Sequence, residues 1–154
     1  PACVSAFRDE LPGILPNDGA ARRLSRQVLF FSEFIDREAK DAPLRQIGGH
    51  AVVQFHCHHH AVLDTHAEEK VLGRAGADYE ILPSGCCGMA GAFGFEAAKY
   101  DVSIAAAERV LLPRLRQTPA DTLVLANGFS CREQIEQCAG RRTLHIAEAM
   151  AGLA

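Results

Sequence analysis

The stretch Ala51-Val52-Val53-Gln54-Phe55 decides the fold class, because it is the first of four short runs with β-strand character. The other three runs span residues 79–82, 122–126 and 143–146, and helical patterns separate all four. Strands that alternate with helices indicate βαβ units, in which the strands pair in parallel and the crossovers are right-handed.

The helical patterns complete this prediction. From Asp18, a residue type that caps helix N-termini, the stretch to Lys40 carries apolar residues at helical spacing. Ser130 and Gly140 are predicted to cap the two ends of a later helix. We therefore predict an α/β fold, a three-layer sandwich with a mostly parallel, four-stranded, Rossmann-like sheet.

The bulk properties describe an ordinary globular domain. The 154 residues fit one domain, residues 1–154, and Pro1 in place of an initiator Met suggests a piece of a larger protein. A net charge of −3 gives no electrostatic reason to expect a nucleic-acid partner. No apolar run approaches the roughly 20 residues of a membrane-spanning helix. The six scattered cysteines, without a secretion signal, favour a reducing, cytoplasmic location.

Four cysteines follow the first three predicted strands. Cys57 comes soon after the first strand, Cys86 and Cys87 after the second, and Cys131 after the third. Because the carboxyl ends of parallel strands meet at one edge of a sheet, we expect these thiols to lie together. Thiolates bind zinc and iron–sulfur clusters, so the sequence predicts a metal site at this edge. Cys138 is predicted to be a small buried hydrophobic residue.

The adjacent Cys86 and Cys87 are the most specific signal. A disulfide between them would close a strained ring, and a regular strand would point their side chains to opposite faces. Gly85, Gly88 and Gly91 permit an irregular turn that aims both side chains at one site. The backbone N–H groups of this turn form a predicted cradle that donates to the ligand sulfurs.

Histidines are candidates for additional or supporting positions. His56 and His58 flank Cys57 and are the preferred candidates, since consecutive histidines point in different directions. His145, in or beside the fourth predicted strand, is expected to be a core or supporting histidine rather than a direct ligand. Cys3 is included as a further candidate.

Several motifs together resemble a known family. It is the cysteine-rich "CCG" domain at the C-terminal end of FAD-linked oxidases and iron–sulfur oxidoreductases. This group includes D-2-hydroxyacid dehydrogenases, the iron–sulfur component of glycolate oxidase and a component of heterodisulfide reductase. The resemblance covers nearly the whole chain. The motifs are Pro1-Ala-Cys3 with Phe7-Arg-Asp-Glu-Leu11, His56-Cys-His58, Cys86-Cys-Gly-Met-Ala-Gly-Ala-Phe-Gly94, Tyr100-Asp-Val-Ser103 and Ser130-Cys-Arg132.

The resemblance implies a function in electron transfer. In this family an FAD domain removes hydride from a 2-hydroxy acid such as glycolate, D-lactate or D-2-hydroxyglutarate, and clusters carry the electrons away. The implied partners are a preceding cysteine-rich module and the ferredoxin-like and FAD domains or subunits of the parent enzyme. Residues 1–45 would include the seam with that module, where Cys3 would belong. The chain would not bind FAD or be active alone, and it would be cytoplasmic or peripheral at the inner face of the membrane.

One departure from the family keeps alternatives open. Cluster-binding relatives carry Cys-x-x-Cys where this chain has Gly128 and Cys131. The leading hypothesis is an iron–sulfur cluster held by Cys57, Cys86, Cys87 and Cys131. The alternatives are a zinc-binding or metal-free docking module of the same enzyme, and a thiol–disulfide redox enzyme.

Overall fold

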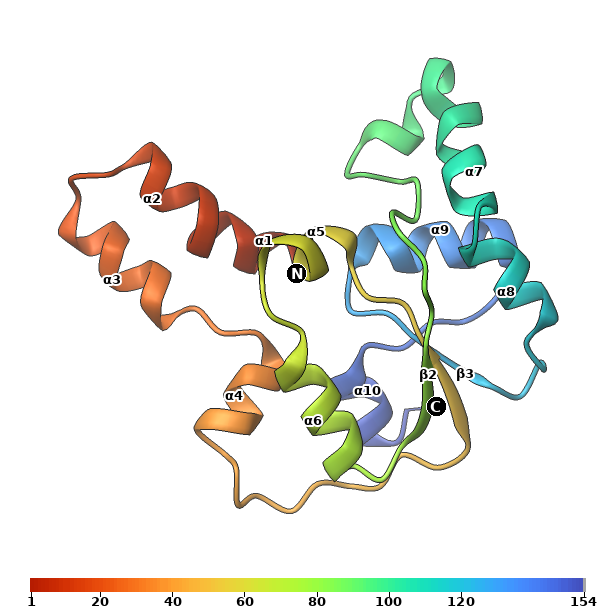
Figure 1. Ribbon diagram of the computed structural model, residues 1–154, viewed down its shortest axis with the longest axis horizontal. Coiled ribbons are helices and arrows are strands. Elements are labelled where there is room, and N and C mark those ends of the chain that lie inside the picture. The colour runs from red at the N-terminus through yellow and green to blue at the C-terminus, as the bar shows by residue number, and fades with distance from the viewer. Residues whose placement is uncertain (154) are drawn as a thin grey trace. The chain divides into compact units, whose positions relative to one another are not determined.

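The computed structural model (Figure 1) describes residues 1–153. They form two compact units. The first unit contains Pro1–Pro43 and His58–Val71, and it is helical. The second contains Leu44–Cys57 and the residues from Leu72 onward, and it holds the sheet. Cys57, at the end of a segment of the second unit, therefore belongs to the same unit as the later cysteines.

The first unit is built from short helices, two of which include residues of the second unit. They are α1 (Ala2–Ser5), the π-helix η1 (Ala6–Glu10), α2 (Leu11–Ile14), α3 (Gly19–Gln27), α4 (Phe31–Arg37), α5 (Cys57–Val62) and α6 (His66–Arg74). Asp18 is the N-cap of α3, as predicted, and its Oδ1 accepts a hydrogen bond from the Ala20 N–H at 2.6 Å. The single helix predicted to Lys40 is wrong, because α3 ends at Gln27 and α4 begins at Phe31.

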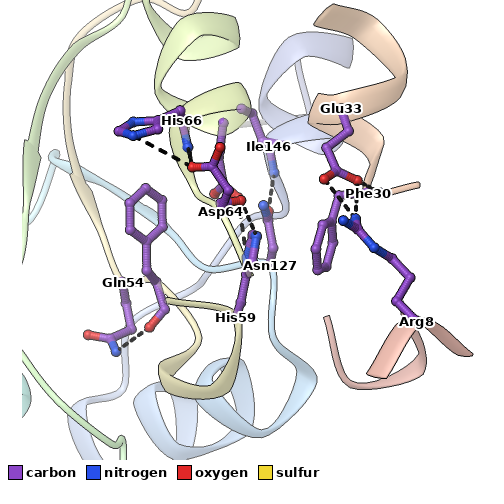
Figure 2. A network of polar contacts seen from close by, with 11 residues as sticks. Arg8, Phe30, Glu33, Gln54, His59, Asp64, His66, Asn127 and Ile146 are labelled. Carbon is purple, nitrogen blue, oxygen red and sulfur yellow. Dashed lines mark hydrogen bonds and ion pairs between the residues drawn. The ribbon is translucent and has the colours of Figure 1, made fainter. Parts of the chain in front are cut away.

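Contacts distant in sequence explain this break. Phe30 has an extended backbone, with φ −65° and ψ 156°, and its N–H donates to Glu33 Oε2 at 2.9 Å. Glu33 also pairs with Arg8, whose Nη1 lies 2.6 Å from Glu33 Oε2 (Figure 2). The Phe30 ring stacks on the ring of His59, with 3.9 Å between centroids. These contacts hold Phe30 outside either helix, and spacing within residues 18–40 does not reveal them.

The second unit contains the remaining elements. They are β1 (His50–Val53), β2 (Asp78–Ile81), the 3₁₀ helices η2 (Phe93–Phe95) and η3 (Ala97–Lys99), α7 (Tyr100–Glu108), α8 (Leu111–Gln117), β3 (Leu123–Leu125), α9 (Phe129–Ala139) and α10 (Ile146–Ala151). The strand order is β2-β1-β3, and β1 pairs in parallel with both neighbours. The mixed α/β class and the parallel pairing are therefore confirmed.

The predicted fourth strand is wrong for the described residues. Only one parallel bridge, between Leu125 and Leu144, extends the three-stranded sheet. The chain turns into α10 directly afterwards, because His145 acts as its N-cap and its Nδ1 accepts from the Ala147 N–H at 3.1 Å. The three-layer, Rossmann-like arrangement stays a prediction.

Helix α9 begins earlier than its sequence signal indicated. Gly128 occupies the N-cap position and no side chain caps the helix, so the predicted Ser130 cap is wrong. The predicted Gly140 cap is confirmed, with a left-handed φ of 60°. None of the helices within residues 1–153 is long and apolar enough to cross a membrane.

The apolar core of the second unit lies against the sheet and includes two of the predicted site cysteines. Its buried members are Val52, Leu82, Cys87, Met89, Leu111, Leu115, Val124, Ala126, Cys131 and Ile135. Strand residues, helix residues and cysteines thus share one packed cluster. The position of the cysteines therefore depends on the same burial that stabilises the unit.

Arg141 fastens the segment between α8 and β3 to the second unit. Its Nη2 donates to the carbonyl oxygens of Thr122 and Pro119 at 2.8 and 3.0 Å. Its Nη1 donates to those of Thr118 and Leu115 at 3.2 and 3.5 Å. The carbonyl groups at and beyond the C-terminal end of α8 have no backbone N–H partner within the helix. The Arg141 guanidinium donates to them instead.

We expect Arg141→Gln to lower the free energy of unfolding by about 1–3 kcal/mol, because the shorter amide cannot reach these carbonyls and leaves part-buried acceptors unpaired. The matched control is Arg23→Gln, which removes an exposed arginine on α3. Urea denaturation followed by circular dichroism measures both variants. Equal midpoints for the two variants would contradict the proposed role of Arg141.

Candidate functional site

Four cysteines follow the carboxyl ends of the three strands. Cys57 opens α5 after β1, Cys86 and Cys87 lie in the loop after β2, and Cys131 lies in the first turn of α9 after β3. All four belong to the second unit. The pKa of Cys131 is raised by its hydrogen bond to Cys87 and by burial, and also by the negative charges that Cys87, Cys57 and Cys86 carry as thiolates, so the four side chains lie near one another.

The four thiols are arranged as two hydrogen-bonded pairs. One pair joins Cys57 and Cys86, and the other joins Cys87 and Cys131. Within residues 1–153, no three His, Cys, Asp or Glu side chains are arranged as a group that could hold a metal ion. The cysteines therefore share one region, but their side chains are oriented pairwise.

The two buried thiols have opposed proton affinities. A hydrogen bond from the Cys131 thiol to the sulfur of Cys87 lowers the pKa of Cys87 to about 6. The same hydrogen bond, together with burial, raises the pKa of Cys131. Cys87 and Cys131 are only 3% and 1% exposed, so Cys87 is the buried thiol that more readily becomes a thiolate.

Backbone N–H groups surround the vicinal cysteines. The Gly88 N–H donates to Cys86 Sγ at 3.3 Å. The N–H groups of Met89 and Ala90 form hydrogen bonds with the sulfur of Cys87 and also favour its thiolate form. Successive N–H groups that converge in this way make an anion-binding concavity of the kind called a nest. These N–H groups favour negative charge on both sulfurs, but burial outweighs the Gly88 hydrogen bond at Cys86 and raises the pKa of that thiol.

The loop has this shape because several residues adopt positive φ. Gly88, Ala90 and Gly91 have φ values of 95°, 45° and 67°. Gly88 also approaches α7 closely, since a Cβ there would lie 2.0 Å from the backbone oxygen of Ser103. Gly85 has neither a positive φ nor a neighbour within 4 Å of such an added Cβ. Of the predicted cradle glycines, Gly88 is thus the most constrained.

Gln54 connects two of the cysteine-bearing loops, and sequence reasoning missed it. It is 1% exposed, and its Nε2 donates to Phe55 O at 2.8 Å (Figure 2) and to Gly85 O at 3.4 Å. The Ser84 hydroxyl donates to Gln54 Oε1. The amide therefore ties the segment after β1 to the residue preceding the vicinal pair. The sequence signal that could have identified Gln54 is its polar side chain within the otherwise apolar run 51–55.

Ser103 provides a second support for the cysteine loop. This residue is 1% exposed, and its Oγ accepts from Gln134 Nε2 of α9 at 3.3 Å. A Cβ at Gly94 would lie 2.8 Å from the same Oγ. The loop thus packs against α7, and α7 is hydrogen-bonded to the helix that carries Cys131.

The two preferred histidines occupy different surroundings. The His56 ring packs against the backbone of Gly128, since a Cβ there would lie 2.6 Å from His56 Cδ2. Gly128 precedes the helix that carries Cys131, so the imidazole lies beside one of the cysteine-bearing segments. His58 lies in α5, and its Nε2 is buried without a hydrogen-bond partner among the described residues.

The other two candidates are placed less favourably for a direct ligand role. His145 caps α10 through its Nδ1, and its backbone N–H donates to Glu148 Oε2 at 2.6 Å. These contacts give His145 a structural function at the start of α10, and its supporting role at the cysteine site stays a prediction. Cys3 is exposed on α1, in the first unit.

We expect Gly88→Ala to lower the free energy of unfolding by about 2–5 kcal/mol, because the added Cβ combines left-handed strain with a clash against Ser103. Gly85→Ala is the matched control in the same loop and should change it by less than about 1 kcal/mol. Thermal and urea unfolding of both variants measure the difference. Similar losses in the two variants would show that Gly88 is not specifically constrained.

Comparisons with known proteins relate the chain to segments of larger dehydrogenases. It is 31% identical to D-2-hydroxyglutarate dehydrogenase of Pantoea ananatis and 29% identical to that of Escherichia coli. It is 30% identical to one component of the anaerobic glycerol-3-phosphate dehydrogenase of E. coli. Each alignment covers 97% of this chain but only 14% of the first two proteins and 39% of the third. No family model and no solved structure matches the chain significantly.

Proposed function

We propose that this chain, a homologue of one segment of these dehydrogenases, is the cysteine-rich redox domain of a larger oxidoreductase that acts on a 2-hydroxy acid. Cys57, Cys86, Cys87 and Cys131 would hold an iron–sulfur cluster, and electrons would reach it from an FAD domain elsewhere in the parent enzyme. The observation that carries this proposal is the grouping of four cysteines, as two hydrogen-bonded pairs, after the carboxyl ends of three parallel strands.

The chemistry of these residues fits a cluster. Four cysteine sulfurs are the usual donor set, and such a cluster, when bound, accepts and releases single electrons. The N–H groups of Gly88, Met89 and Ala90 stabilise negative charge on the ligand sulfurs. Cys87 and Cys131 lie in the apolar core, which excludes water from that side of the site. The paired thiols would have to reorient to face a common group, because no three such side chains within residues 1–153 are arranged around one ion.

His56 is proposed as an additional donor. Its ring occupies the space beside Gly128. By the family resemblance, Gly128 stands where cluster-binding relatives carry the first cysteine of Cys-x-x-Cys. Glycine at position 128 leaves that space to the imidazole, because any larger side chain there would collide with it. A histidine completes cysteine shells in both iron–sulfur and zinc sites.

We expect anaerobic reconstitution with iron and sulfide to give a coloured protein with an EPR signal in one of its accessible oxidation states. Cys87→Ser and Cys131→Ser should each lose at least about half of the bound iron, because each removes a thiolate ligand. Cys138→Ser is the matched control, since Cys138 lies on α9 with Cys131 but outside the four-cysteine group. Iron and sulfide analysis, with EPR, measures the outcome.

Other outcomes of this experiment would favour a zinc site or contradict the assignment of Cys131. A colourless protein that retains one zinc per chain, and loses thermal stability on chelation, would replace the cluster with a structural zinc site. Iron loss in Cys138→Ser equal to that in Cys131→Ser would contradict the assignment of Cys131.

The thiol pairing favours a second candidate, a thiol–disulfide redox enzyme. In that reaction the Cys87 thiolate attacks a disulfide of a small thiol and releases one thiol as the leaving group. Cys131 then displaces the second thiol, and the protein retains a Cys87–Cys131 disulfide. The low pKa of Cys87 and its hydrogen bond to Cys131 are the supporting observations.

Under this alternative, metal-free protein treated with oxidised glutathione should form Cys87–Cys131 rapidly, and Cys131→Ser should accumulate a stable mixed disulfide at Cys87. Peptide mass spectrometry under non-reducing conditions distinguishes these products. Formation of a cluster by the native chain, with no disulfide turnover, would rule out this candidate.

A further inference from the structure

A cavity of about 170 Å³ lies between the vicinal-cysteine loop and the junction of α7 and α8. Its lining includes Ser84, Gly85 and Cys86 on the loop, and Ala106, Arg109 and Val110 at the end of α7 and in the link to α8. This volume has room for roughly five or six water-sized groups. Cys86 therefore belongs both to the four-cysteine group and to the wall of a separate small cavity.

The charge of this cavity is positive. Arg109 is its only permanently charged lining residue, and no Asp or Glu is among the residues that line it. Arg114 and Arg116, further along α8, are paired with Glu80 and Glu108. Arg109, in contrast, forms no ion pair within residues 1–153 and is exposed. Its guanidinium is thus available to an external anion.

The rest of the lining restricts the kind of anion. Pro83, Ala106, Val110 and Leu111 supply apolar surface beside the single guanidinium. A planar guanidinium binds a carboxylate through two parallel N–H donors, and apolar walls suit a short carbon chain. An inorganic oxyanion would leave those walls without a partner.

We propose that this cavity binds a short aliphatic carboxylate beside Cys86, with Arg109 as its counter-charge. The site does not depend on a metal at the cysteines, so it goes beyond the proposed function and can be tested in metal-free protein. If the four cysteines hold a metal or cluster, the cavity would place a small carboxylate beside Cys86, on one side of that group.

Iodoacetate and iodoacetamide test this site, because they differ mainly in charge and both alkylate thiols. The cysteine sulfur forms a bond to carbon, the carbon–iodine bond breaks, iodide leaves and the thiol proton passes to the buffer. The measurement is the iodoacetate-to-iodoacetamide rate ratio at Cys86, determined by peptide mass spectrometry on the reduced, metal-free 154-residue chain. The exposed Cys3 of the same molecules is the internal reference.

We expect the ratio at Cys86 to exceed that at Cys3, and to fall roughly two- to fivefold in Arg109→Gln. Arg23→Gln, at an exposed arginine of α3, should leave the ratio unchanged. In the native chain, excess propionate should slow the reaction of Cys86 with iodoacetamide, and it should do so less in Arg109→Gln.

Any one of three rate measurements would contradict the proposed carboxylate site. They are an unchanged ratio in Arg109→Gln, an equal fall in Arg23→Gln, and protection by inorganic phosphate that matches or exceeds protection by propionate. A Cys86 that neither reagent modifies would also overturn it, because the cavity would then be closed to small anions. None of these results depends on whether iron or zinc binds the cysteines.

Discussion

Because β1 pairs in parallel with both β2 and β3, the three strands end at one edge of the sheet. Each strand is followed within a few residues by a loop or a helix start that carries one or two of the four cysteines. The central strand thus fixes the spacing of loops that are far apart in sequence. The sheet register therefore brings the cysteine-bearing segments to one edge, and long-range contacts such as that of Gln54 with Gly85 connect them there.

The vicinal cysteines impose a second constraint on this edge. In a regular strand, two adjacent side chains point to opposite faces. Cys86 and Cys87 can therefore face one region only where the backbone departs from that regular geometry. The positive φ values at Gly88, Ala90 and Gly91 provide that departure, and the N–H groups exposed by it point toward sulfur. The conformation that aims the thiols is therefore the same one that stabilises their charge.

The sequence predicted those features that depend on local chemistry or on strand order. Asp18 and Gly140 were identified as helix caps because their residue types act locally, and parallel strands followed from the alternation of elements. The break at Phe30 was missed because it depends on Arg8 and His59, which are distant in sequence. The fourth strand was overpredicted because His145 begins α10 just after the single bridge at Leu144. At the site, residue types indicated the four cysteines, whereas supports such as the Gln54 contact with Gly85 and the fit of His56 against Gly128 required coordinates.

The burial of Cys87 and Cys131 links the chemistry of the site to the stability of the unit. A thiolate in an apolar core is costly unless hydrogen bonds compensate for the water that it loses. Cys87 receives hydrogen bonds from Cys131, Met89 and Ala90, whereas Cys131 retains its proton. A second negative sulfur in this core is disfavoured, because the hydrogen bond to Cys87 and burial both raise the pKa of Cys131. Hydrogen bonding and burial therefore favour one proton on this pair, held by Cys131, and any group bound through both sulfurs would have to displace it.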